Sequence, residues 1–124
     1  MYLWNFSSFA NSVRHWCLAC FGSSVTYDKQ ERNHRFLEES LELVQACGCT
    51  AGEAHQLVDY VFNRAVGEPL QETGGVLVTL AALCNANTIN MNSAAATELD
   101  RIWANIGSIR LKQASKPKNS PLPQ

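Results

Sequence analysis

Along most of the chain, apolar residues recur every three or four positions, and short runs containing glycine or proline interrupt the pattern. This spacing places apolar side chains on one side of an α-helix, whereas a half-buried strand needs strict alternation of apolar and polar residues. Glycine and proline are the residues that most often separate helices. The sequence therefore predicts an all-α fold, a bundle of about five helices.

The ends of the expected helices are marked by residues that favour caps. Asp28 is a good N-cap, Thr50 is followed three residues later by Glu53 as in a capping box, and Pro69 stands at a first-turn position. Glycine residues follow three of the helical segments, where a helix commonly ends. The expected helices cover roughly residues 6–21, 29–48, 50–64, 69–86 and 93–114.

A chain of 124 residues can form one domain with a core, yet it is short enough that helices could be shared with a second copy. We expect a single domain over residues 1–114 and a flexible, proline-rich tail over 115–124. The net charge of −1 and the pI near 6.3 provide no basic field for nucleic acid or an anionic membrane. No apolar run approaches the roughly 18 residues of a membrane span, and the first residues lack the basic start of an export signal, so a cytoplasmic location is expected.

Five cysteines are present, an odd number that does not suit a disulfide framework. Cys17 and Cys20 form a CxxC, and Cys47 and Cys49 form a CxC, so a four-thiolate zinc site is conceivable. The favoured interpretation is different: Cys17 and Cys20 lie one helical turn apart in an apolar segment, where cysteine behaves as a small hydrophobic residue.

Three carboxylates crowd into the segment EESLE, at Glu38, Glu39 and Glu42. At 100° per residue, the apolar residues of this helix occupy an arc of about 160°, and the three acids gather on the other side. Glu31 and Glu39 each lie four residues from Arg35, which allows ion pairs along the helix. Such a charged face is ordinary for a solvated helix. Taken alone, the three acids therefore indicate a solvent-exposed helix face and not a functional site.

The helix expected over residues 69–86 favours a functional site over a plain charged surface. One side of this helix carries small residues, and carboxylates precede them at its N-terminal end. Residues on this lane follow helical spacing: Glu68, Glu72, Gly75, Thr79, Ala82 and Ala86. Another helix could approach closely along the lane and bring Glu72 toward the acids of residues 38–42. Converging carboxylates repel unless a cation lies between them, and oxygen ligands without cysteine or histidine favour Mg²⁺ or Mn²⁺. We therefore expect a magnesium site that keeps positions open for phosphate oxygens.

Basic residues for such a phosphate group occur on the last expected helix. Arg101 and Lys112 lie on its polar side, and Arg110 flanks its apolar stripe. The three could hold a polyphosphate beside the metal, although basic residues near a helix C-terminus also complement the helix dipole. Phosphate binding by at least one of them is the expectation.

This set of residues resembles the MazG-like family of all-α nucleoside triphosphate pyrophosphohydrolases, whose signature is EExxE followed after a spacer by ExxD. Residues 38–42 match EExxE in every fixed letter, and the second half reads Glu72-Thr73-Gly74-Gly75 within ETGGVLVTLAALC. The resemblance covers roughly residues 32–112. It implies a helical bundle completed by self-association, as a homodimer or homotetramer, and hydrolysis of a nucleoside triphosphate to monophosphate and pyrophosphate.

The resemblance also implies roles for the acids. Glu39, Glu42 and Glu72 would be ligands to Mg²⁺, with Mn²⁺ as a substitute, and Glu38 would be a further ligand or the base that orients the attacking water. Gly75 stands where the family carries an aspartate, and the spacer between the two half-motifs is longer than usual. The missing ligand could come from Glu68, from Glu98, from Asp59 or from water.

Two other functions fit parts of the sequence. A di-iron bundle needs two ExxH units on different helices, and residues 31–34 supply a single one. A non-catalytic helical module that binds nucleotides or a protein partner, with its metal site eroded at Gly75, is the stronger alternative. Metal binding and pyrophosphate release distinguish the enzyme from this module.

Overall fold

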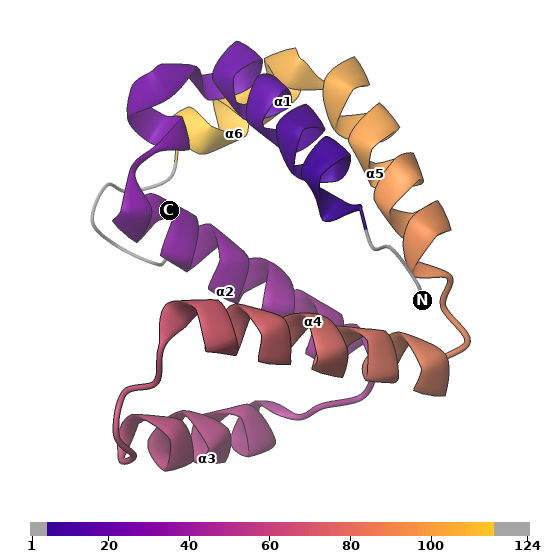
Figure 1. Cartoon of the computed structure of the whole chain (residues 1–124). Coiled ribbons are helices and arrows are strands. Elements are labelled where there is room, and N and C mark those ends of the chain that lie inside the picture. Colours follow the sequence, from indigo (N-terminus) through magenta and orange to yellow (C-terminus); the bar gives the residue numbers. More distant parts are fainter. Residues whose placement is uncertain (1–4, 116–124) are drawn as a thin grey trace. The chain divides into compact units, whose positions relative to one another are not determined.

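A computed structural model describes residues 5–115 of the chain, and these residues form helices without any strand (Figure 1). The all-α prediction is therefore confirmed at the level of fold class. Within the described residues, no helix has the length and apolar character needed to cross a bilayer. The helices are α1 (Phe6–Thr26), α2 (Lys29–Ala46), α3 (Ala51–Phe62), α4 (Pro69–Ala86), α5 (Met91–Ala104) and α6 (Ile106–Ala114).

Side-chain caps fix the starts of α2, α3 and α4 where the sequence predicts them. The Asp28 carboxylate accepts a hydrogen bond from the Glu31 N–H at 3.1 Å, as an N-cap does. Thr50 and Glu53 form the predicted capping box: the Thr50 hydroxyl accepts from the Glu53 N–H at 3.2 Å, and the Glu53 carboxylate accepts from the Thr50 N–H at 2.9 Å. The Glu68 carboxylate accepts from two backbone N–H groups of the first turn of α4.

The predicted break at Gly22 is present, but the chain continues for another turn beyond it. Gly22 has φ of 78° and ψ of 176°, so the helical path bends there before α1 ends at Thr26. A positive φ is costly for residues with a Cβ atom, which explains the glycine at this position. Gly48 has φ of 97° and follows α2 in the same way.

The single helix predicted over residues 93–114 is wrong, because α5 and α6 are separated at Asn105. The Asn105 side chain donates to the Arg101 carbonyl at 2.7 Å, and its own carbonyl accepts from the Ser108 hydroxyl at 3.1 Å. Asparagine competes in this way for backbone groups that a continuous helix would use. The break lets α6 follow a direction different from that of α5 (Figure 1).

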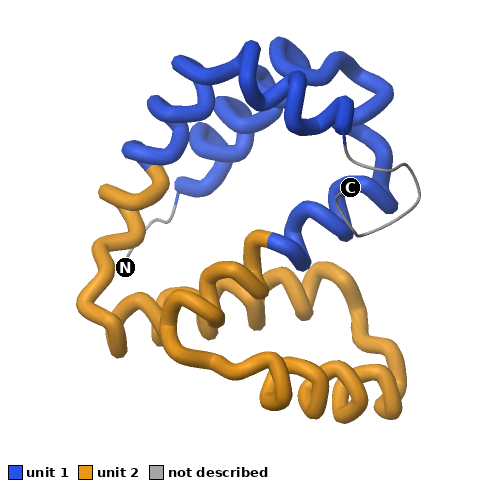
Figure 2. The backbone as a smooth tube through the Cα atoms, turned by 180° about the vertical axis from the view of Figure 1, so that it is seen from behind, with its two compact units in different colours: residues 1–38, 96–124 blue, residues 39–95 orange. Residues whose placement is uncertain are grey.

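The chain divides into two compact units, coloured separately in Figure 2. Unit 1 comprises residues 1–38 and 96–124, and its core is centred on α1 where that helix packs against α6. The Trp16 indole N–H donates to the Ile102 carbonyl at 2.9 Å. The residues of this core are Trp16, Cys17 and Cys20, with Val13, Phe21, Ile102, Ile106 and Ile109 packed around them.

Unit 2 comprises residues 39–95 and has almost no core of its own. Cys84 of α4 is its single buried residue. Helix α3 buries none of its side chains. The single domain predicted over residues 1–114 stays a prediction, and the predicted tail lies largely outside the described residues.

Candidate metal and phosphate site

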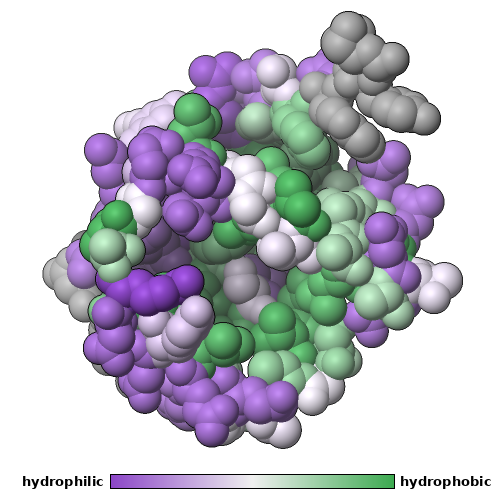
Figure 3. Space-filling view, turned by 60° about the horizontal axis from the view of Figure 1, so that its bottom comes forward, coloured by the Kyte–Doolittle hydropathy of each residue, from purple (hydrophilic) through white to green (hydrophobic). Residues whose placement is uncertain are grey.

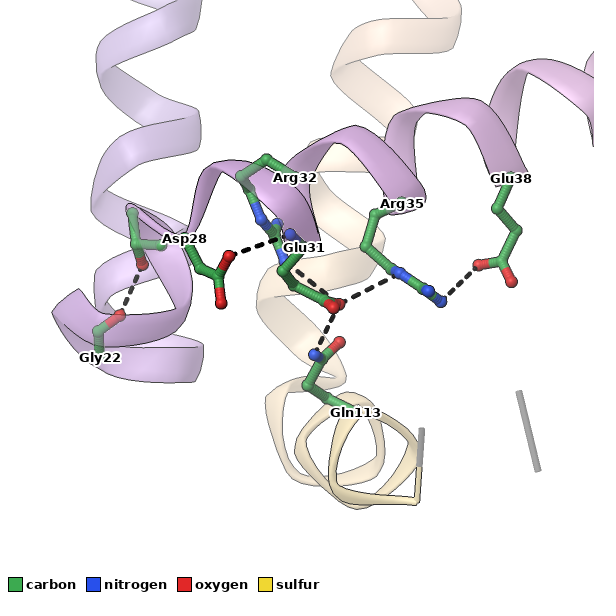
Figure 4. Close-up of polar contacts among 8 residues, drawn as sticks. Gly22, Asp28, Glu31, Arg32, Arg35, Glu38 and Gln113 are labelled. Atoms are coloured by element: carbon green, nitrogen blue, oxygen red, sulfur yellow. Dashed lines mark hydrogen bonds and ion pairs between the residues drawn. The ribbon is translucent and has the colours of Figure 1, made fainter. Parts of the chain in front are cut away.

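The first acid of the EExxE segment is held by a neighbouring arginine on α2 (Figure 4). Arg35 bridges two carboxylates, with its Nε 3.1 Å from Glu31 and its Nη1 3.2 Å from Glu38. The predicted pairing of Arg35 with Glu31 is confirmed, whereas the predicted pairing with Glu39 is wrong, because the guanidinium contacts Glu38 instead. The guanidinium restricts the Glu38 carboxylate to one side of the helix, as a positioned base or ligand requires.

The next two acids of the segment, Glu39 and Glu42, are exposed on α2. Within the described residues, neither carboxylate has a basic partner. A carboxylate without a cationic partner keeps its oxygen lone pairs available for a metal ion. Glu39 and Glu42 therefore have the chemistry of hard-cation ligands, and both belong to unit 2.

Glu72, the predicted ligand from the second half-motif, lies in the first turn of α4 and is exposed. Its carboxyl group folds back toward Gly67, so closely that a Cβ atom at position 67 would collide with it. Because the Glu72 side chain is exposed and can move, this contact does not by itself require a glycine at position 67. Glu72 has no basic partner in the described part of the chain.

Among residues 5–115, no three side chains of histidine, cysteine, aspartate or glutamate are grouped closely enough to hold a metal ion. The structure therefore does not bring the predicted ligands together within one chain. Two of the acids considered for the position of Gly75 are engaged elsewhere: Glu68 caps α4, and Glu98 pairs with Arg101. Asp59 on α3 is exposed and stays available.

The predicted phosphate-binding residues have different surroundings in unit 1. Arg101 pairs with Glu98 one turn earlier on α5. Arg110 donates to the Cys20 carbonyl at 2.7 Å and to the Ala19 carbonyl, so it caps the end of α1 before the bend. Lys112 is exposed and has no acidic partner among the described residues. Of the three basic residues, Lys112 is therefore the one whose charged group has no partner in the described part of the chain.

The prediction that Cys17 and Cys20 act as small hydrophobic residues is confirmed. Cys17 and Cys20 are buried in the unit 1 core, and Cys20 is 4% exposed. Burial raises the pKa of both thiols, while the charge of Arg32 opposes the rise at Cys17. The raised pKa keeps both thiols protonated, as is typical of cysteines that pack in a core.

The glutamate of the ExxH segment, Glu31, already contacts two other side chains. The Glu31 carboxylate accepts a hydrogen bond from the Gln113 side chain at 2.8 Å in addition to its ion pair with Arg35 (Figure 4). These contacts tie α2 to the end of α6 within unit 1. Glu31 thus has a structural role, which sequence spacing indicated for Arg35 but not for Gln113, 82 residues away.

Arg32 is a residue that sequence reasoning missed. Its guanidinium lies 5.6 Å from the centre of the Phe21 ring, and two of its nitrogens are buried without a hydrogen-bond partner in the described chain. Arg32 and Phe21 come from helices separated by the turn at residues 27–28, so helical spacing gave no signal for the pair.

Comparisons with known protein families, with curated proteins and with solved structures find no match. The MazG-like assignment therefore stays a proposal, carried by the motif and by the state of its acids.

Proposed function

We propose that the protein is a divalent-metal-dependent nucleotide pyrophosphohydrolase that cleaves a nucleoside triphosphate to monophosphate and pyrophosphate. The observation that carries the proposal is the state of three acids at the motif positions. Glu39, Glu42 and Glu72 are exposed and lack basic partners among the described residues. Three other acids, Glu31, Glu38 and Glu98, are paired with arginine, whereas Asp59 and Asp100 are exposed without such a pair in the described chain, like the three motif acids.

The chain's own residues divide into ligands, a positioned carboxylate and phosphate contacts. Glu39, Glu42 and Glu72 would hold Mg²⁺ or Mn²⁺, because their donor set consists of carboxylate oxygens alone. The bound ion would neutralise charge on the phosphates and activate water. Glu38, fixed by Arg35, would orient that water or complete the ligand set.

Phosphate contacts would come from the basic residues of α5 and α6. Lys112 is available without breaking an existing contact in the described chain, whereas Arg101 and Arg110 would have to share their present partners. We therefore place Lys112 first among the three for the substrate's polyphosphate. The assembly expected for the active form is a homodimer or homotetramer.

The test is pyrophosphate release from a panel of nucleoside triphosphates with Mg²⁺ or Mn²⁺. Glu42→Gln and Glu72→Gln should lose at least 100-fold in turnover while keeping the helical content, since each removes a charge from the metal site. Asp100→Asn is the matched control, an exposed acid of α5 outside the site, and should keep full activity. Full activity in both glutamine variants would refute the assignment.

A second candidate is a non-catalytic helical module that binds a nucleotide or a protein partner. It is favoured by one observation, the lack of any three potential ligands grouped within residues 5–115. If the protein is such a module, the wild type releases no pyrophosphate from any nucleotide. It then binds Mn²⁺ no more tightly than the Glu42→Gln variant does.

A further inference from the structure

The turn between α2 and α3 carries two cysteines that the proposed function does not use. Residues 47–49 read Cys-Gly-Cys, and both cysteines are half-buried free thiols. Every residue of the turn and of the helix ends beside it, from 43 to 54, belongs to unit 2. The local geometry of the pair is therefore described within one unit.

Backbone hydrogen bonds form a Schellman motif at this turn, a common way for a helix to end. The Cys49 N–H donates to the Val44 carbonyl at 2.9 Å, and the Gly48 N–H donates to the Gln45 carbonyl at 3.0 Å. Gly48 has φ of 97°, a left-handed conformation that residues with a Cβ atom rarely adopt. The chain thus turns at Gly48, with one cysteine on each side of it.

This motif predicts that both thiols lie beside one residue, Val44. Cys47 follows Val44 by three positions, and residues at this spacing are neighbours on a helix surface. In a Schellman motif, the residue at the position of Cys49 commonly folds back onto the residue at the position of Val44. Cα atoms two positions apart are at most about 7 Å apart, and closer in a turn, whereas disulfides span about 4.4–6.8 Å. A disulfide between the two cysteines therefore needs no movement of either helix.

The sharing of one turn, and not exposure, distinguishes these two cysteines. Apolar side chains are visible among polar ones on the face drawn in Figure 3, so partial exposure of an apolar residue is common in this chain. Cys17, Cys20 and Cys84 are buried, and burial raises the pKa of the Cys17 and Cys20 thiols. Because the thiolate is the reactive form, the buried pair is disfavoured as a nucleophile.

We propose that Cys47 and Cys49 are a redox-active dithiol that reduces small disulfides, such as oxidised glutathione, and is reversibly oxidised in return. One cysteine, as thiolate, attacks a sulfur of the small disulfide, which breaks the S–S bond and releases one small thiol. The second cysteine, as thiolate, attacks the protein sulfur of this mixed disulfide, forms the Cys47–Cys49 bond and releases the second small thiol. The two cysteines give up two protons and two electrons, and the small disulfide takes them up as two thiols.

The size of the closed loop suits this bond to exchange and not to a structural role. A disulfide stabilises a fold more when it closes a longer loop. The Cys47–Cys49 bond closes a loop of three residues, which the hydrogen bonds of the motif already hold. Little folding free energy therefore opposes its reduction, as in the labile disulfides that take part in exchange. No acid of the candidate metal site takes part, so the reaction does not depend on the proposed hydrolase function.

Redox titration of the full chain tests the proposal. The protein is equilibrated in mixtures of reduced and oxidised glutathione, quenched with acid, alkylated in denaturant and measured by mass spectrometry. As oxidised glutathione increases, the wild type should lose the alkylation sites at residues 47 and 49, and its mass before alkylation should fall by two hydrogen atoms. Dithiothreitol should restore both sites, and Cys17, Cys20 and Cys84 should stay alkylated throughout.

Single variants separate the two steps of the exchange. Cys47→Ser and Cys49→Ser each lack the second thiol, so each should retain one bound glutathione at the remaining cysteine where the wild type retains none. Circular dichroism checks that both variants stay helical, and the wild-type titration decides the matter if either does not fold. Five free thiols in the wild type at every ratio, a stable mixed disulfide, or a disulfide at other cysteines or between two chains would overturn the proposal.

Discussion

Arg110 is predicted to stabilise the protein whether or not it binds phosphate. Its Nε donates to the Cys20 carbonyl at 2.7 Å, and a second nitrogen donates to the Ala19 carbonyl. These carbonyls belong to the turn before Gly22, whose non-helical φ and ψ interrupt the regular helix. Replacing Arg110 with methionine keeps the aliphatic stem and removes both donors.

The expected loss follows from the two bonds. Hydrogen bonds to a charged donor contribute about 1.5–3 kcal/mol each when well buried. Arg110 is exposed and one of its bonds is at the surface, so solvent competes for the donors. We expect Arg110→Met to lower the free energy of unfolding by about 2 kcal/mol in total.

Urea unfolding followed by circular dichroism measures this loss without any nucleotide present. Arg110→Lys is the matched control: it keeps the charge but cannot reach both carbonyls with a planar guanidinium, so it should recover less than half of the loss. If Arg110→Met unfolded at the wild-type urea concentration, the cap would contribute nothing and the contact would be incidental.

Three further predictions concern other parts of the chain. Thiol labelling with a maleimide should modify the half-buried Cys47 and Cys49 before Cys17 and Cys20; prior labelling of Cys17 or Cys20 would contradict the core described for unit 1. The hydrogen bonds from Thr50 lower the pKa of Glu53, so its stabilisation is present above the usual glutamate pKa and is lost as the pH falls through the lowered value. Thermal unfolding of Glu53→Gln should therefore differ from the wild type at neutral pH and converge with it in acid, and a difference independent of pH would refute this. Trp16→Phe should cost about 1–3 kcal/mol in urea unfolding, because it removes the bond to a half-buried carbonyl and leaves part of the indole volume empty.

The helix starts could be predicted from sequence because each is decided within four residues. The Asp28 cap, the Thr50–Glu53 box and the proline start at Pro69 are all local, and the structure has them where expected. The break at Asn105 is also local, but the apolar spacing continues across it and indicated one helix. The competing hydrogen bond from the Asn105 side chain decided otherwise.

Contacts between distant segments could not be predicted from spacing. The bond from Arg110 to Cys20 and that from Gln113 to Glu31 join residues 90 and 82 positions apart. The same holds for burial: the apolar arc of α2 was evident, yet Phe36, Leu37 and Leu41 are exposed in the chain. Periodicity shows which side of a helix is apolar, but not what covers that side.

The same contrast between local features and distant contacts applies to the candidate site. The motif located the acids, and the structure shows three of them exposed and without basic partners in the described chain. Whether they converge depends on packing beyond one chain's local pattern. No helix periodicity determines that geometry.

Manganese binding followed by electron paramagnetic resonance tests the central claim most directly. Titration of the full chain should show Mn²⁺ taken up by the wild type and by Asp100→Asn. Glu42→Gln and Glu72→Gln should bind at least tenfold more weakly, a difference of about 1.4 kcal/mol. Equal affinity in all four proteins, or no uptake by the wild type, would contradict a metal site built from these glutamates.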